Sequence, residues 1–213
     1  MLMSGMLVSG CASYRFSSSM ETPRGDVELP IGTKFRIDTV SFSIATNAAS
    51  GSLDFGALDP VNQDFRGRLS SEALRLYPQV FTDDPSAIPL AITILRSGYD
   101  LDVGADSCIS CLTLTILPMR STDRTDYRVD VAAVPARDIG RLNPVVFTFT
   151  ETSWLSLFPT GWIPVPGGTG DRAWGMDRGL QVNESMMLRS TIDAIVTIIR
   201  RTDPSDWKEA AGK

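Results

Sequence analysis

DPVNQDFRGRLSSEALRLYPQV, residues 59–80, has apolar residues at every third or fourth position, whereas the segments on both sides of it have them at every second position. Its apolar side chains recur at these longer steps as Phe65, Leu69, Ala73, Leu76, Tyr77 and Val80. This spacing predicts an amphipathic helix. Asn62 or Asp64 can cap its start, and Pro78 should end it near Leu76 or Tyr77, because proline disfavours a helical residue before it.

On both sides of this helix, apolar and polar residues alternate as they do in strands with one buried face. The alternating segments are residues 34–44, 90–103, 112–117, 127–133 and 145–154. We expect a polar turn over residues 118–125 to join the third and fourth segments as an antiparallel hairpin.

A second helix is predicted near the C-terminus, where apolar residues return to helical spacing. The stripe consists of Leu188, Ile192, Ile195, Val196 and Ile199. Asn183 or Ser185 can cap this helix, and Asp203-Pro204 lies just beyond its end. The order strand, helix, four strands, helix predicts an α+β fold in which an antiparallel sheet of about five strands packs against two helices.

Composition limits what such a domain can do. The 213 residues include 20 Lys and Arg against 25 Asp and Glu, so the formal charge is −5 and nucleic acid is disfavoured as a partner. Histidine is absent, which excludes Ser-His-Asp and Cys-His mechanisms and removes the commonest metal ligand. We therefore expect no enzymatic activity, no metal and no cofactor.

The N-terminus carries the most specific signal in the sequence. Residues 1–10 form a short run that contains no charge, and Val8-Ser9-Gly10-Cys11 closes it with a hydrophobic residue, two small residues and a cysteine. This is a targeting segment by composition, and it resembles the lipobox of bacterial lipoproteins. The other interpretation is an ordinary thiol at Cys11. No Lys or Arg precedes Cys11, so we expect the natural start of the signal peptide to lie upstream of Met1.

The resemblance implies cleavage before Cys11, a diacylglyceryl group on its thiol and a further acyl chain, such as palmitate, on its new amino group. One acyl chain, at about 0.8 kcal/mol per CH₂, binds a membrane only reversibly, whereas several chains give stable attachment. Ala12 follows the cysteine in place of the aspartate that retains many lipoproteins in the inner membrane. By resemblance, the protein is anchored in the outer membrane and faces the periplasm.

The remaining boundaries follow from these features. Residues 1–10 are the signal peptide, and residues 11–33, Ser-rich and without sustained periodicity, are expected to form the lipidated N-terminus and a flexible tether. One α+β domain is expected over residues 34–203, with a C-terminal tail over residues 204–213.

Cys108-Ile-Ser-Cys111 has the spacing of a redox motif, but it precedes a predicted strand where redox motifs open a helix. In an oxidising compartment, Cys108 and Cys111 can form a disulfide that closes a turn. Unpaired thiols or an incomplete metal pair are the other possibilities.

Residues 154–174 hold three of the four tryptophans in a stretch rich in proline and glycine. The candidate contact residues are Trp154, Phe158, Trp162 and Trp174. Such a loop is either a lid with buried rings or a contact surface for a membrane or a partner. Arg66, Arg68 and Arg75 are expected on a solvated helix face, with contact to acidic lipid headgroups as the alternative.

Together these features predict a lipid-anchored envelope protein that is not an enzyme and that assists assembly, scaffolding or regulation by contacting another envelope protein or the membrane. The order of elements is similar, in topology only, to small outer-membrane assembly lipoproteins such as the lipopolysaccharide-assembly lipoprotein. The alternative is a periplasmic module that binds a small molecule or a lipid in a pocket between the sheet and the helices.

Overall fold

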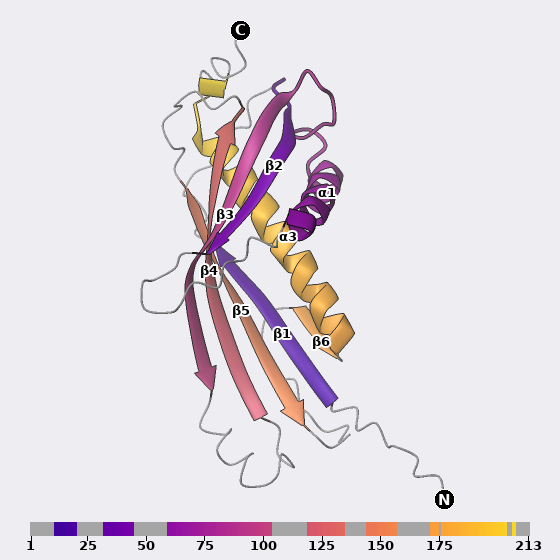
Figure 1. The fold of residues 1–213 in the computed structure, drawn as a ribbon, viewed down its shortest axis with the longest axis vertical. Helices are drawn as coiled ribbons and strands as arrows, with labels where there is room; N and C mark the ends of the chain where they lie inside the picture. The colour runs from indigo at the N-terminus through magenta and orange to yellow at the C-terminus, as the bar shows by residue number, and fades with distance from the viewer. Residues whose placement is uncertain are drawn as a thin grey trace, which may run out of the picture. The chain divides into compact units, whose positions relative to one another are not determined.

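The computed structural model describes residues 11–20, 32–44, 59–103, 119–134, 144–156, 171–174, 176–203 and 206–207. These residues form an α+β fold with a six-stranded sheet and two long helices, as predicted (Figure 1). The strands are β1 (Cys11–Met20), β2 (Phe35–Ile44), β3 (Ile88–Val103), β4 (Met119–Ala133), β5 (Val145–Ser156) and β6 (Asp171–Trp174), and the helices are α1 (Asp59–Leu76) and α3 (Met176–Arg201).

The sheet is mixed, where the sequence predicted an antiparallel one. Its strand order is β2-β3-β4-β5-β1-β6, and β2 pairs with β3 in parallel. The reason is the helix between them, because α1 returns the chain to the end of the sheet where β2 began. β1 and β6 pair antiparallel. β4 and β5 are antiparallel as well. Ser121, Thr122 and Asp126 of β4 contact, in this order, Ser153, Thr152 and Thr148 of β5, so the residue numbers rise along one strand and fall along the other.

The chain divides into two compact units. One comprises Met1–Ser18, Tyr99–Thr125 and Phe149–Met186, and the other comprises Ser19–Gly98, Asp126–Thr148 and Met187–Lys213. The sequence predicted a single domain over residues 34–203. The strands β1, β3, β4 and β5 and the helix α3 each contribute residues to both units.

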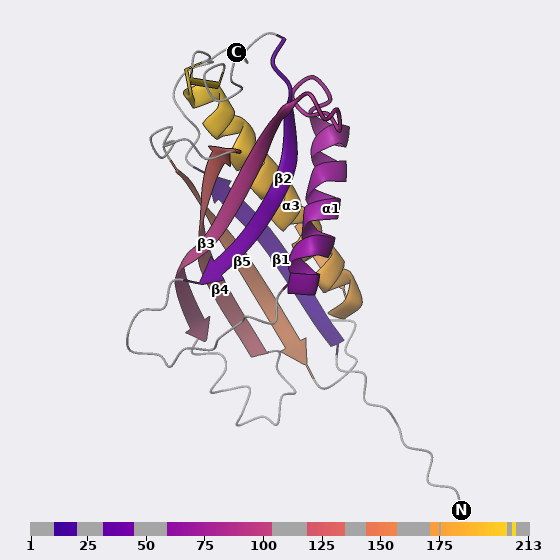
Figure 2. The ribbon, with the colours of Figure 1, turned by 45° about the horizontal axis from the view of Figure 1, so that its top comes forward.

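Helix α1 ends at Leu76, as Pro78 predicted, and packs beside β2 in the second unit (Figures 1 and 2). Leu69 and Ala73 of its apolar stripe are fully buried, and Phe65 meets Phe42 of β2 edge to face at 4.9 Å. In β2, a register shift between Ile37 and Thr39 inserts an extra residue. Because of this bulge, the apolar side chains before and after it lie on the same side of the strand, the side of α1.

The first half of β4 corrects the predicted turn over residues 118–125. This segment is polar, yet it lies in a strand, because its hydroxyl groups find partners on β5. The Oγ atoms of Ser121 and Ser153 are 2.7 Å apart, and the buried Thr122 donates to Thr152 over 3.4 Å. The predicted strand over residues 112–117 lies outside the described residues.

β1 replaces the predicted tether over Cys11–Met20. Phe16 is 1% exposed, and its ring lies 5.9 Å from that of Tyr14 and 6.1 Å from that of Phe149. Tyr14 and Phe16 are two residues apart and so lie on one face of the strand. Burial of Phe16 therefore orders a segment whose serines suggested flexibility.

Two further differences concern the C-terminal part of the chain. α3 begins at Met176, so Asn183 and Ser185 lie inside the helix and not at its cap. Trp207, which the sequence placed in a tail, is fully buried and meets Phe35 edge to face at 5.0 Å. The predicted apolar stripe of α3 is confirmed, since Ile192, Ile195 and Ile199 are fully buried.

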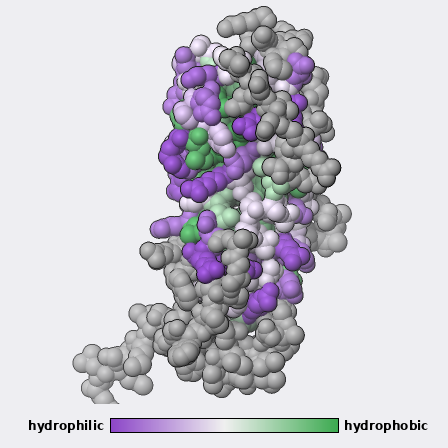
Figure 3. All heavy atoms as spheres, turned by 180° about the vertical axis from the view of Figure 1, so that it is seen from behind, coloured by the Kyte–Doolittle hydropathy of each residue, from purple (hydrophilic) through white to green (hydrophobic). Residues whose placement is uncertain are grey.

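The surface of the described residues is mixed in polarity. Figure 3 shows small green regions separated by purple ones on the face that it presents. The large apolar or aromatic side chains exposed among the described residues are Tyr99, Leu101 and Val146. Single exposed apolar residues of this kind are ordinary on a protein surface.

In the second unit, Tyr77 links the end of α1 to α3. Its hydroxyl donates to Asp193 Oδ1 over 2.7 Å, and burial, followed by this bond, raises the pKa of Tyr77 to about 12. Because the bond ends on a charged group in a partly buried place, Tyr77→Phe should lower the free energy of unfolding by about 1–2 kcal/mol. Urea denaturation at pH 7 measures this loss.

A double-mutant cycle with Asp193→Ala separates the bond from other effects of Tyr77→Phe. The two losses should be clearly less than additive. Strict additivity would show that Tyr77 and Asp193 do not stabilise the helix pair through each other.

Candidate functional site

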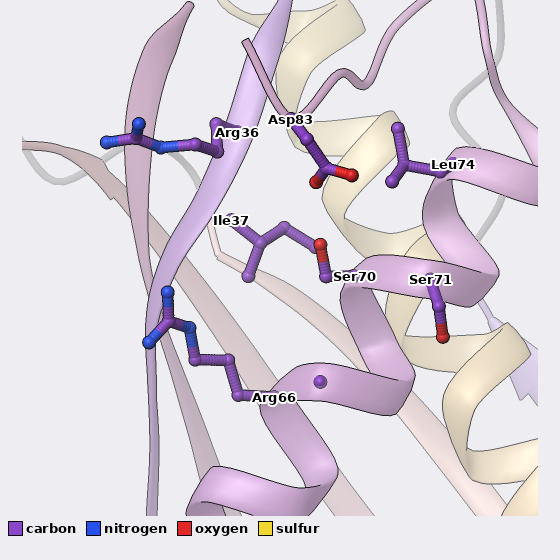
Figure 4. Close-up of a pocket in the computed structure, with 8 residues that line it drawn as sticks. Arg36, Ile37, Arg66, Ser70, Ser71, Leu74 and Asp83 are labelled. Carbon is purple, nitrogen blue, oxygen red and sulfur yellow. The ribbon is translucent and has the colours of Figure 1, made fainter. Parts of the chain in front are cut away.

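A groove of about 570 Å³ lies between α1 and β2 in the second unit (Figure 4). Its volume is in the range of small-molecule sites. It is lined by Arg36 and Ile37 of β2, by Arg66, Gly67, Ser70, Ser71 and Leu74 of α1, and by Asp83 of the segment that follows α1.

The groove exists because one side of α1 carries short side chains. Gly67, Ser70 and Ser71 lie beside the buried stripe of the helix and leave the space next to β2 unfilled. A Cβ added at Gly67 would meet nothing within 4 Å. Two apolar side chains, Ile37 and Leu74, complete the wall.

Arg66 and Asp83 differ from the other charged residues around α1. Along the helix, Arg68 pairs with Asp64 at 2.7 Å, and Arg75 donates to Glu72 over 2.7 Å. Arg66 and Asp83 form no hydrogen bond or ion pair with another residue that the structure describes. In Figure 4 Asp83 points toward the groove from the segment after α1, and Arg66 extends from α1 toward β2. The groove therefore offers one cation and one anion to a ligand.

Arg36 lines the groove, but its charged group does not point into it. Figure 4 shows its guanidinium directed away from Asp83 and across β2. There its Nη2 lies 3.3 Å from Asp38 Oδ1, and its Nε is buried without a hydrogen-bond partner among the described residues. Arg36 is thus held away from the groove.

A second polar feature, a pair of carboxylates, lies in the first unit. The contacts of Ser121 with Ser153 and of Thr122 with Thr152 set the register of β4 against β5, and this register places Asp123 opposite Glu151. Asn183 of α3 donates its amide to Glu151 Oε2 over 3.1 Å. Like charges opposite each other destabilise a strand pair.

Burial, followed by the nearby charge of Asp123, raises the pKa of Glu151, and the hydrogen bond from Asn183 opposes this rise only in part. On the neighbouring β1, burial and then the charge of Glu151 raise the pKa of Tyr14. Glu151 therefore takes up a proton more readily than an ordinary glutamate does. Nothing that the structure describes beside it suggests a substrate.

Sequence reasoning missed both features. Arg66 is exposed, as the sequence predicted, but its place in the lining of a groove with Asp83 was not foreseen. The predicted turn over residues 118–125 includes Asp123, which lies in β4. The run of small residues beside the apolar stripe of α1 was the available signal for the groove.

The structure does not bring the sequence-predicted site residues together in one place. Cys11 is the first residue of β1. Trp154 lies in β5 and is 6% exposed, so it belongs to the core, and Trp174 ends β6. The other predicted residues, Phe158, Trp162, Cys108 and Cys111, lie outside the described part of the chain, and the disulfide stays a prediction.

Within the described part of the chain, no group of three or more Cys, Asp or Glu side chains is placed to hold a metal ion. No described helix combines the length and the apolar character needed to cross a membrane.

Comparisons with known proteins give little further information. No family model matches the chain, and no curated protein matches it by sequence. Among solved structures, the chain is similar to a dodecamer of a PelC point variant from Paraburkholderia phytofirmans, with 12% identity over 87% of this chain and 97% of that one. The TM-score is 0.29, which supports no inference about function or assembly.

Glu151→Gln tests the carboxylate pair. The folded chain holds the proton of Glu151 more tightly than the unfolded chain does, so this group stabilises the fold fully below its unfolded pKa of about 4.3. That stability is lost as the pH rises through the folded pKa. The glutamine variant should therefore be more stable than the parent at pH 7 and should show a flatter dependence on pH between 4 and 7.

Urea denaturation at several pH values gives this comparison. Asp100→Asn, at an exposed carboxylate of β3, is the matched control and should leave the slope unchanged. An unchanged slope for Glu151→Gln as well would mean that neither burial nor the charge of Asp123 raises the pKa of Glu151 in the folded chain.

Proposed function

We propose that this chain is a lipid-anchored protein of the bacterial envelope that acts through contacts and not through catalysis. Its acylated residue is Cys11, and Ala12 favours the outer membrane facing the periplasm. The observation that carries the proposal is the coincidence of two features at one residue. The cysteine of the lipobox-like Val8–Cys11 is also the first residue of β1.

This coincidence determines how the anchor relates to the folded chain. The first registered pair of β1 is Ser13 with Trp174, two residues after Cys11. At about 3.3 Å per strand residue, the anchor lies about 7 Å along the chain from this pair. A mature protein that begins at Cys11 then has no spacer, and the first unit is held at the membrane surface.

The contact surface is proposed next to the anchor. Residues 157–170 connect β5 to β6, and the connection ends at a strand whose Trp174 stands opposite Ser13. With Trp154 assigned to the core, the contact residues are Phe158, Trp162 and Trp174. Aromatic side chains at such a place suit a membrane interface or a second envelope protein in assembly, scaffolding or regulation.

Replacement of the anchor residue tests the first part of the proposal. Cys11→Ala should release the chain from the membrane fraction of its native host, because no acyl chain is attached. Intact-mass spectrometry of the parent should show a chain that starts at Cys11 and carries acyl groups. Cys108→Ala is the matched control and should stay in the membrane fraction, and an unprocessed, unacylated parent chain would overturn the proposal.

Two tryptophan variants test the contact surface against the core. Trp162→Ala should reduce crosslinking of the chain to its envelope partner or membrane several-fold without a change in stability. Trp154→Ala removes a ring that is 6% exposed and should cost about 3–5 kcal/mol of unfolding free energy. Unfolding of the Trp162→Ala variant would place that ring in the core as well.

A further inference from the structure

We propose that the groove between α1 and β2 binds a short peptide that keeps both of its charged ends. The ammonium group of the peptide would lie against Asp83 and its carboxylate against Arg66. This inference goes beyond the membrane anchor and does not depend on it, since every residue that it uses lies in the second unit.

Charge is the first argument. Arg66 and Asp83 both line the groove, and neither is paired within the described part of the chain. A ligand with only negative charge meets Asp83, and a ligand with only positive charge meets Arg66, so each is repelled at one end. A zwitterion matches both groups. The planar guanidinium of Arg66 is also suited to a carboxylate, which it can bind through two hydrogen bonds.

The wall between the two charges is the second argument. Leu74 offers partly exposed apolar surface beside the buried Ile37, and Ser70 offers a hydroxyl that can donate to or accept from an amide. In Figure 4 the side chains of Ser70 and Ile37 point toward each other across the groove. A peptide has the matching parts between its ends, namely an amide bond and a small apolar side chain.

The test uses the purified full-length chain and the dipeptide alanyl-leucine as probe, followed by isothermal titration calorimetry. A ligand of this size should bind with a Kd on the order of 1 mM or tighter. N-acetylation or C-amidation of the dipeptide should each weaken binding to the parent about fivefold, as expected for loss of one exposed ion pair.

Variants assign each end of the ligand. In Asp83→Asn, N-acetylation should cause no further loss of affinity, and in Arg66→Gln, C-amidation should cause none. Arg68→Gln is the matched control, because Arg68 pairs with Asp64 on the same helix and does not line the groove. It should bind the dipeptide as the parent does.

Gly67→Leu tests the place of binding. The new side chain has free space at its Cβ and improves the helix propensity of α1, so the variant should fold as stably as the parent while losing the dipeptide. Retained binding in this variant would overturn the proposal.

The proposal also fails if alanyl-leucine does not bind, if its blocked forms bind equally well, or if phosphoethanolamine binds and the dipeptide does not. Because the groove variants leave Cys11 intact, they should all remain in the membrane fraction. Failure of this proposal is thus distinguishable from failure of the anchor.

Discussion

Insertion of β1 between β5 and β6 is the constraint on which the rest of the first unit depends. β6 has four residues and pairs with β1, so it needs β1 to belong to the sheet. Burial of Phe16 between Tyr14 and Phe149 stabilises the inserted strand. Because this apolar contact holds β1 in the sheet, Cys11, the first residue of the strand, is directly next to the folded chain.

The same insertion connects the proposed anchor with the polar chemistry of the first unit. Tyr14 of β1 lies near enough to Glu151 for the carboxylate to raise the pKa of its hydroxyl. Glu151 in turn stands opposite Asp123 and receives a hydrogen bond from Asn183 of α3. A strand that begins at the proposed acylation site thus lies beside a glutamate whose pKa is raised by burial and by a nearby carboxylate.

The sequence predicted those elements in which burial and periodicity agree. α1, the stripe of α3 and β5 have apolar residues that repeat with the period of the element, and β2 does so on each side of its register shift. β1 and the first half of β4 escaped prediction because serines and threonines occupy positions that are buried in the fold, as at Ser13, Thr122 and Thr125. Composition suggests a loop there, whereas hydroxyl pairs with β5 make a strand possible for β4 and burial of Phe16 does so for β1. The groove was equally hard to predict, since it depends on which side of α1 faces β2, and the carboxylate pair depends on the register of β4 against β5.

Amide hydrogen exchange of residues 13–16, in the chain isolated from the membrane fraction of its host, tests most directly whether the proposed anchor joins the folded chain without a spacer. A paired β1 predicts protected amides in this segment, with opening far slower than that of a free chain end. Exchange at the rate of an unstructured chain would show that residues 11–20 are a tether after all, and the first unit would then be free to leave the membrane surface.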